Sequence, residues 1–216
     1  MSNLKAALIG LGAMGKNHAR VLKSLPGVDL VAVFDPATTP GSSELPIVSS
    51  LQELIEIKPD YCVIATPTYT HEEIAVQLME AGINIFIEKP IFDKIEENVD
   101  LVSLIQKNNI KTYIACNLRF HPSIKFLKNF IEKTSKKINE VNVYCGSYLP
   151  SWRSGTNYTE SYSAKKNMGG GVHLDLIHEL DYIIWLFVLP MNYSSKKRKV
   201  SQLQIDSYDY CTYNLE

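Results

Sequence analysis

The chain has 216 residues, which corresponds to one large domain or two small ones. A formal net charge of −1, with 45% hydrophobic and 21% charged residues, predicts a globular protein and argues against disorder and against nucleic acid as a partner. The longest apolar run, which ends at Pro190, is too short to span a bilayer, and the N-terminus does not resemble a secretion signal, so we expect a cytoplasmic protein without a membrane partner.

Short β-rich runs alternate with helical patterns through the first half of the chain, an order typical of a parallel sheet with crossover helices. The expected strands are residues 4–9, 30–34, 61–65, 84–87 and 111–115, and the expected helices are residues 13–25, 51–57, 71–81 and 95–108. Residues 36–46 contain three prolines and are expected to be mainly loop, with a further short strand at 45–48 as an alternative. We therefore predict an α/β fold, with a Rossmann-type doubly wound parallel sheet in residues 1–118.

Local signals mark several helix ends in this half. Thr70 and Glu73 have the spacing of a capping box at the start of the helix 71–81, and Gly82 follows its last turn. Pro26 and Gly27 close the first helix.

The pattern changes after residue 116, and a second α/β domain is expected over residues 119–216. The expected elements are a helix at 124–133, an exposed strand at 139–148, a long polar loop at 149–167, an apolar helix from glycines 169–171 to about residue 189, and short strands at 200–206 and 208–214. The basic run 194–200 is interpreted as a solvated loop rather than a nuclear-localisation signal. The predicted helices are too few to cover the sheet of this second domain, so the sheet is expected to be open and partly missing. An unpaired sheet edge favours association with a second copy of the chain, and a homo-oligomer is therefore expected.

The cysteines do not suggest a disulfide or a metal site. Cys62, Cys116, Cys145 and Cys211 are widely spaced, form no CxxC pair and lie in apolar or strand-like segments, which predicts reduced thiols. No metal is expected, because no HExxH motif is present and His173 and His178 lie on different sides of a helix.

The clearest ligand-binding motif follows the first predicted strand. Gly10, Gly12 and Gly15 fit the pattern GxGxxG, with Ala13 and Met14 between the last two glycines, and the motif has a strand before it and a helix after it. Glycines at these positions permit a tight turn and a close approach of the backbone to a pyrophosphate, which the N-terminus of the helix attracts. The loop is therefore predicted to bind a dinucleotide.

Asp35 ends the second predicted strand, 20 residues after Gly15. An acidic side chain at this distance accepts hydrogen bonds from the ribose hydroxyls of the adenosine and repels a 2′-phosphate. The cofactor is therefore predicted to be NAD in preference to NADP.

Two further strands end in polar segments at the edge where an open parallel sheet binds ligands. Thr66 and Pro67 follow the strand 61–65, His71 begins the next helix, and Glu88 and Lys89 follow the strand 84–87. All are candidate cofactor-binding residues. Lys89 precedes a proline and is held at the strand end rather than in a helix; the alternative is a surface lysine that pairs with Glu88.

The glycine loop and the segment Glu88-Lys89-Pro90, at this separation, resemble those of the Gfo/Idh/MocA oxidoreductases, relatives of glucose-fructose oxidoreductase and inositol dehydrogenase. The glycine-led segment 169–181 agrees, so the resemblance covers essentially the whole chain. It implies catalytic acid–base roles beside the nicotinamide for Lys89 and His178, assisted by Asp175. Many members place the histidine four residues after the aspartate; the spacing of three here marks a subgroup.

The residue pattern of this segment supports the assignment independently. Asp175, His178, Asp181 and Tyr182 have the spacing of one polar stripe on an otherwise apolar helix. Polar groups on such a helix need partners or a cleft. The alternative is a satisfied buried histidine in an interdomain contact.

Candidate substrate-binding residues lie in three polar or aromatic segments. They are Asn117 and Arg119 after the last strand of the first domain, Tyr148, Trp152 and Arg153 at the start of the long loop, and Tyr162 just before the glycines. Arginine binds a carboxylate or phosphate through two hydrogen bonds, and aromatic faces pack on sugar C–H groups, so these residues fit a polyhydroxylated or acidic sugar. The alternative is a hydrogen-bonded loop between the domains.

These observations and the resemblance together imply an NAD-dependent oxidoreductase that transfers hydride between nicotinamide and a carbinol carbon of a sugar. A nucleotide-activated or acidic sugar of surface-polysaccharide or nonulosonic-acid metabolism is the implied substrate. The alternative is a dinucleotide-binding regulator or interaction module without turnover.

Overall fold

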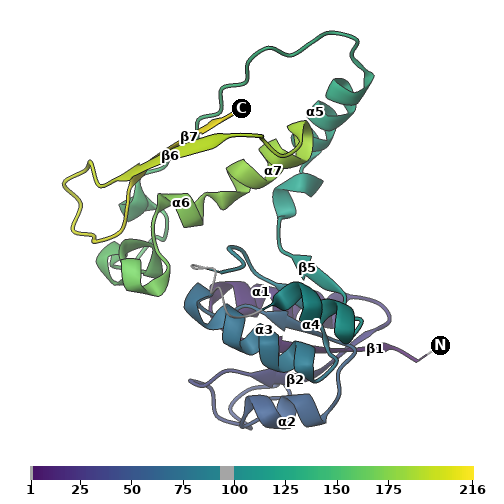
Figure 1. Cartoon of the computed structure of the whole chain (residues 1–216). Coiled ribbons are helices and arrows are strands. Elements are labelled where there is room, and N and C mark those ends of the chain that lie inside the picture. The colour runs from purple at the N-terminus through teal and green to yellow at the C-terminus, as the bar shows by residue number, and fades with distance from the viewer. Residues whose placement is uncertain (1, 93–99) are drawn as a thin grey trace. The chain divides into compact units, whose positions relative to one another are not determined.

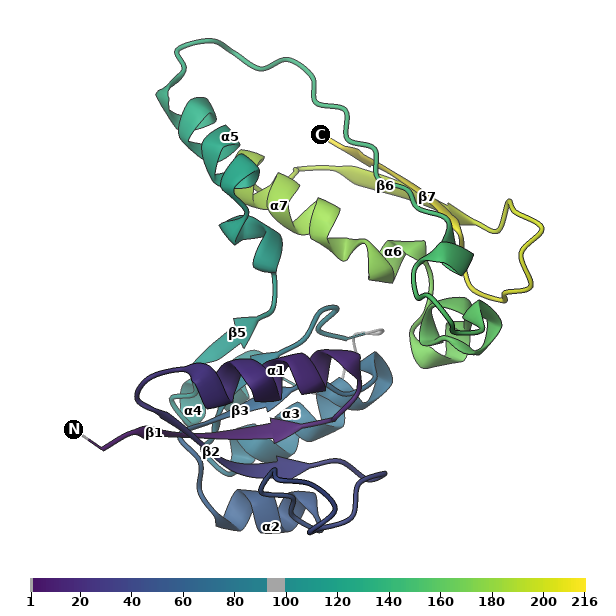
Figure 2. The same ribbon diagram turned by 180° about the vertical axis from the view of Figure 1, so that it is seen from behind.

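Figures 1 and 2 show the computed structural model of the chain, which describes residues 2–92 and 100–216. The chain divides into two compact units, Met1–Ala115 and Cys116–Glu216. Among the described residues, no helix has both the length and the apolar character that a membrane span requires.

The first unit is built on a five-stranded parallel sheet, which confirms the predicted fold class. Its strands are β1 (Leu4–Ile9), β2 (Val28–Phe34), β3 (Tyr61–Ile64), β4 (Asn84–Ile87) and β5 (Thr112–Ile114), in the order β2-β1-β3-β4-β5. Instead of a further strand at 45–48, a single parallel bridge joins Val33 and Ile47. The chain order reverses between β1 and β3, and the carboxyl ends of these strands form the switch point where such sheets bind ligands.

Helices cover both faces of this sheet. Helix α1 (Ala13–Ser24) lies on one face and α2 (Leu51–Glu56) on the other, as Figure 2 shows, and α3 (His71–Glu80) and α4 (Leu101–Lys107) share the face of α2. Side chains alternate along β1: Ala6 and Leu8 join the core under α1, whereas Ala7 and Ile9 join the other core. Residues 95–99 of the predicted helix 95–108 lie outside the described residues.

The predicted capping box at Thr70 is wrong, whereas the predicted glycine ends are present. Thr70 makes no side-chain cap, because it belongs to a 3₁₀ turn and its hydroxyl donates to the carbonyl of Pro67 at 2.8 Å and lies 2.7 Å from Thr66 Oγ1. Gly27 and Gly82 have φ angles of 77° and 76°, the left-handed conformation that glycine adopts most readily after a helix.

The second unit contains two longer helices and a hairpin. Helix α5 (Pro122–Lys133) is followed by an irregular segment with the 3₁₀ turns η3 (Leu149–Ser151), η4 (Tyr158–Glu160), η5 (Tyr162–Ala164) and η6 (Lys166–Met168). Helices α6 (Val172–Asp175) and α7 (Ile177–Phe187) lead into the antiparallel strands β6 (Tyr193–Arg198) and β7 (Tyr210–Leu215). A 3₁₀ turn, η2 (Asn117–Phe120), begins the unit.

The strands predicted in this half are partly wrong. The segment 139–148 is exposed and pairs with no strand of the described chain, and the expected loop 194–200 instead forms most of β6. The hairpin loop begins after Arg198, and in it the Asp209 carboxylate accepts hydrogen bonds from the backbone N–H groups of Val200 at 2.7 Å and Ser201 at 3.0 Å. The segment 200–206 is therefore loop and not strand.

The long apolar helix is also interrupted. Leu176 has φ −102° and ψ 27°, so that α6 ends and α7 begins within the expected single helix, and α7 ends at Phe187, before the predicted end at residue 189. Asp175 and His178 therefore belong to two successive helices.

Candidate functional site

The glycine loop between β1 and α1 uses its three glycines in different ways. A Cβ on Gly10 would lie 2.6 Å from the Ala65 carbonyl oxygen, and one on Gly15 would lie 1.9 Å from that of Gly10, so both positions need glycine for packing. A Cβ on Gly12 would meet nothing within 4 Å. Gly12 is thus the glycine that leaves open space beside the start of α1.

This open space fits the pyrophosphate of a dinucleotide. Gly12 precedes α1 and its position carries no side-chain cap, so the first N–H groups of the helix, including those of Ala13 and Met14, are available to an anion. No acidic residue lies in the first turn of α1 to repel it.

Asp35 lies next to this loop and shapes it. Its Oδ2 accepts a hydrogen bond from the Leu11 N–H at 2.7 Å, and its Oδ1 accepts from the Ala37 N–H at 3.0 Å and the Thr38 hydroxyl at 3.1 Å. Carboxylate oxygens can accept more than one bond each, so Asp35 can hold the loop and still accept from ribose hydroxyls. Its negative charge opposes a 2′-phosphate.

The segment after β3 is linked to the segment after β4 by His71. The ring is 1% exposed, with Nε2 2.9 Å from the Thr66 carbonyl oxygen and Nδ1 3.1 Å from the carbonyl oxygens of Pro90 and Ile91. Both ring nitrogens face backbone carbonyl oxygens, and a contact of His71 with the cofactor stays a prediction. Thr66 is half-buried and Pro67 is exposed at the same end of the sheet.

Glu88 and Lys89 follow β4, as expected. Glu88 is buried and its Oε1 lies 2.7 Å from His18 Nε2, while its Oε2 accepts from the Lys89 backbone N–H at 3.2 Å. Glu88 is therefore a buried partner of His18, and its contact with the cofactor stays a prediction. The side chain of Lys89 is half-buried at the carboxyl end of the sheet.

In the second unit, Asp175 is buried at the end of α6. It accepts a hydrogen bond from Ser163 Oγ at 3.3 Å. Burial, and then the negative charge of Asp175, raise the pKa of Tyr162, over whose ring the Arg153 guanidinium lies at 5.1 Å. A Cβ on Gly170 would lie 2.0 Å from the Tyr162 carbonyl oxygen, so the glycine allows α6 to begin close to this turn.

His178 lies on α7 in a different charged group. Asp181, on the same helix, accepts a hydrogen bond from Arg119 Nε at 2.8 Å. Burial alone would raise the pKa of Asp181, but hydrogen bonds from Arg119 and Cys116 and the nearby charges of Arg119 and His178 lower it.

The expected polar stripe thus has separate partners: Asp181 pairs with Arg119, and the Tyr182 hydroxyl donates to Glu179. The Arg119 guanidinium donates two hydrogen bonds to the Asp181 carboxylate. Fewer of its N–H groups are therefore available to a substrate. Asn117 is exposed in the same turn.

A pocket of about 530 Å³ lies within the second unit. It contains three of the predicted residues, Tyr148, Trp152 and Asp175. Residues that the sequence did not single out complete the lining: Ser147, Leu149, Ser163, Val172, Val200, Ser201, Gln202, Leu203, Ile205, Ser207, Tyr208 and Asp209. Most come from the hairpin loop, whose fold back onto η5, with Ser207 Oγ donating to the Ser163 carbonyl at 2.7 Å, could not be predicted from local sequence.

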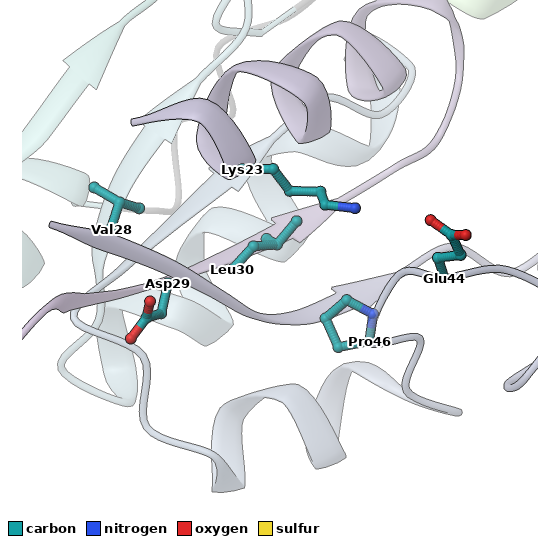
Figure 3. Close-up of a pocket in the computed structure, with 6 residues that line it drawn as sticks. All are labelled: Lys23, Val28, Asp29, Leu30, Glu44 and Pro46. Atoms are coloured by element: carbon teal, nitrogen blue, oxygen red, sulfur yellow. The ribbon is translucent and has the colours of Figure 1, made fainter. Parts of the chain in front are cut away.

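A smaller hollow of about 290 Å³ in the first unit does not belong to the dinucleotide site. Figure 3 shows its lining of Lys23, Val28, Asp29, Leu30, Glu44 and Pro46, with the Lys23 ammonium directed toward the Glu44 carboxylate. It lies at the start of β2, whereas Asp35 follows the opposite end of that strand. In the described ranges 2–92 and 100–216, no group of three or more His, Cys, Asp or Glu side chains could hold a metal ion.

The fold and the glycine loop define a dinucleotide-binding Rossmann protein. Residues 4–115 match the GFO_IDH_MocA family, described as an oxidoreductase family with an NAD-binding Rossmann fold. The chain belongs to the Gfo/Idh/MocA oxidoreductase family, which confirms both the resemblance and the expected NAD-binding Rossmann fold.

Several relatives show how far the similarity extends. The chain is 30% identical to levoglucosan dehydrogenase of Pseudarthrobacter phenanthrenivorans over 79% of this chain and 47% of that protein. It is 27% identical to 2,7-anhydro-N-acetylneuraminate hydratase of Mediterraneibacter gnavus over 86% of this chain and 50% of that protein. The chain thus spans about half the length of these relatives.

Solved structures share the fold at lower identity. The WlbA dehydrogenase of Bordetella pertussis, solved with NADH and UDP-GlcNAcA, matches with a TM-score of 0.81 and 19% identity, over 99% of this chain and 63% of that one. GenD2 from gentamicin A biosynthesis, solved with NAD, matches with a TM-score of 0.79 and 22% identity, over 100% of this chain and 63% of that one.

Proposed function

We propose that the chain belongs to an enzyme that oxidises or reduces a sugar at a carbinol carbon with NAD. The observation that carries the proposal is the open space at Gly12, between the free N-terminus of α1 and the Asp35 carboxylate, on the same sheet edge as Lys89. When bound, NAD supplies the hydride acceptor or donor. Gly12 and the start of α1 bind the pyrophosphate, and Asp35 binds the adenosine ribose.

The reaction also needs groups that move the hydroxyl proton of the substrate. Lys89, at the end of β4, stabilises negative charge on the substrate oxygen, and His178 removes or returns its proton. Asp175 assists, as the family resemblance implies.

The pocket in the second unit is the proposed sugar site. The rings of Tyr148 and Trp152 offer faces for sugar C–H groups in the pocket, which Asp175 also lines. Tyr162, with the Arg153 guanidinium over its ring, interacts with Asp175 without lining the pocket itself. Asn117 and Arg119 are further candidates for substrate contact. An acidic or nucleotide-activated sugar is the substrate class that fits this mixture of aromatic and cationic groups.

Turnover of a panel of inositols, acidic sugars and nucleotide sugars, followed through NADH formation, tests the proposal. Lys89→Ala and His178→Ala should each lower turnover by ~10²-fold or more and leave NAD affinity nearly unchanged, whereas Asp175→Asn should cost less. Lys107→Ala, an exposed lysine of α4, is the matched control. NAD binding without turnover of any panel member would instead support a dinucleotide-binding regulator or interaction module.

A further inference from the structure

Two histidines from different helices hold the chain on either side of Lys89. Before it, the Glu88 carboxylate lies 2.7 Å from His18 Nε2 of α1. Only 17% of the His18 side chain and 12% of the Glu88 side chain are exposed. Since hydrogen bonds are electrostatically stronger away from water, this contact fixes the carboxylate that also accepts from the Lys89 backbone N–H.

After Lys89, the chain is held by His71 of α3. Its Nδ1 lies 3.1 Å from the carbonyl oxygens of both Pro90 and Ile91, and its Nε2 lies 2.9 Å from that of Thr66. The ring therefore joins the polar segment that follows β3 to the segment that follows Lys89.

We propose that His18 and His71 are positioning residues for Lys89. The proposal rests on the proposed function of Lys89. Helix α1 begins at the glycine loop and α3 begins after Thr66 and Pro67, so the two helices that border the dinucleotide side of the sheet also fix the lysine. Neither histidine needs to touch the substrate.

Paired substitutions separate the two links of His71. In His71→Asn the amide nitrogen lies near the former Nδ1 and can still donate to Pro90 and Ile91, whereas in His71→Gln it lies near the former Nε2 and can donate only to Thr66. His71→Gln should therefore lower kcat by about 10²-fold, the scale of a reacting group misplaced by roughly 1 Å, and His71→Asn should lose clearly less. The Kd for NAD should change little in both.

His18 offers a second pair that does not depend on the folding of the His71 variants. His18→Gln keeps a donor near Nε2 and should retain most of kcat, whereas His18→Leu removes the donor and should resemble His71→Gln. Equal kcat values for His18→Leu and His18→Gln would overturn the role of His18.

Measurements without turnover keep this proposal separate from the proposed function. Hydrogen exchange at the Lys89 amide should be faster in His18→Leu and His71→Gln than in the conservative variants His18→Gln and His71→Asn. Unchanged exchange would overturn the positioning. If no sugar is turned over, the proposed function fails and the exchange result still decides the positioning of the Lys89 segment.

Discussion

The Asp35 carboxylate accepts backbone hydrogen bonds from Leu11 in the glycine loop and from Ala37 after β2. Asp35→Asn keeps an acceptor for the loop but removes the negative charge that opposes a 2′-phosphate, so the preference for NAD over NADP should narrow. Fluorescence titration with both cofactors measures this change. Asp29→Asn, near the opposite end of β2, is the control, and equal affinities in the unaltered chain would contradict the prediction.

His173 should make stability depend on pH below neutrality. Burial, and then the positive charges of Lys197 and Lys166, lower its pKa from 6.5 to about 4. Between these values the unfolded chain binds more protons than the folded chain, so a fall in pH from about 6.5 to about 4 favours unfolding. The Tm of the His173→Phe variant should therefore fall less between pH 7 and pH 5 than the Tm of the unaltered chain. The same loss in both would contradict the assignment.

Single residues were predictable where a local motif fixes their role, and not where a distant partner does. Gly12 and Asp35 were identified because glycine spacing and the end of a strand are visible in sequence. The contact of His18 with Glu88 joins residues 70 positions apart, and no spacing rule selects that pair. Arg119 was expected to face a substrate because sequence does not reveal that Asp181 accepts two of its hydrogen bonds.

At the scale of the element, the glycine loop between β1 and α1 contains one glycine that is needed for packing, Gly15, and one that is proposed to bind the phosphate, Gly12. Gly15→Ala should destabilise the chain by roughly 1–3 kcal/mol, because the new Cβ would overlap the Gly10 carbonyl. Gly12→Ala meets open space and has φ −62°, so the fold should tolerate it, while the methyl group blocks the phosphate. Its NAD affinity should fall by about tenfold, the equivalent of ~1.4 kcal/mol.

Thermal unfolding and NAD titration of both variants test this separation. Loss of NAD binding in Gly12→Ala at an unchanged Tm is the expected result. A normal NAD affinity in that variant would show that the phosphate does not approach Gly12.

The end of α7 carries a strained residue. Val188 has φ 76° and ψ 172°, a backbone conformation that β-branched residues disfavour, and its side chain is 79% exposed. Val188→Gly should therefore raise the free energy of unfolding by ~1 kcal/mol, because strain is relieved and little packing is lost. Denaturant titration measures this free energy. Leu189→Gly is the control, because Leu189 is 75% exposed but has no positive φ. A less stable Val188→Gly variant would refute the argument.

Elements were predicted well where hydrophobic periodicity is local and less well where pairing is not. The buried strands of the first unit are nearly continuous apolar runs bounded by turns, and all of them were identified. In the second unit, the alternation of apolar and polar residues predicted a strand at 139–148, which has no partner among the described residues. The basic run that forms most of β6 was instead predicted to be a loop, because lysines are typical of solvated segments. The interruption between α6 and α7 at Leu176 was not predicted, because no proline or glycine lies there.

At the scale of the whole molecule, the β6–β7 hairpin should influence whether copies of the chain associate with each other. β6 and β7 pair only with each other within the described chain, and all side chains of β6 are exposed, including Lys196, Lys197 and Arg198. Lysines on an edge strand oppose pairing with a second copy. Raising NaCl to about 1 M shortens the screening length to ~3 Å and should increase the mass measured by light scattering.

A variant tests whether these charges are the cause. Lys196→Thr combined with Arg198→Thr should associate already at low salt, since both changes leave strand-compatible residues without charge. A constant mass for both proteins at all salt concentrations would count against a homo-oligomer formed through this sheet.

The distribution of aromatic residues between the two units has a spectroscopic consequence. Both tryptophans of the chain, Trp152 and Trp185, belong to the second unit, whereas the first contains Phe86 stacked on Tyr113 with ring centroids 5.3 Å apart. Tryptophan fluorescence therefore reports on the second unit alone, and near-ultraviolet circular dichroism adds a signal from the first. The melting of each unit can be followed in the unlabelled chain, and stabilisation confined to the first unit would leave the fluorescence transition in place.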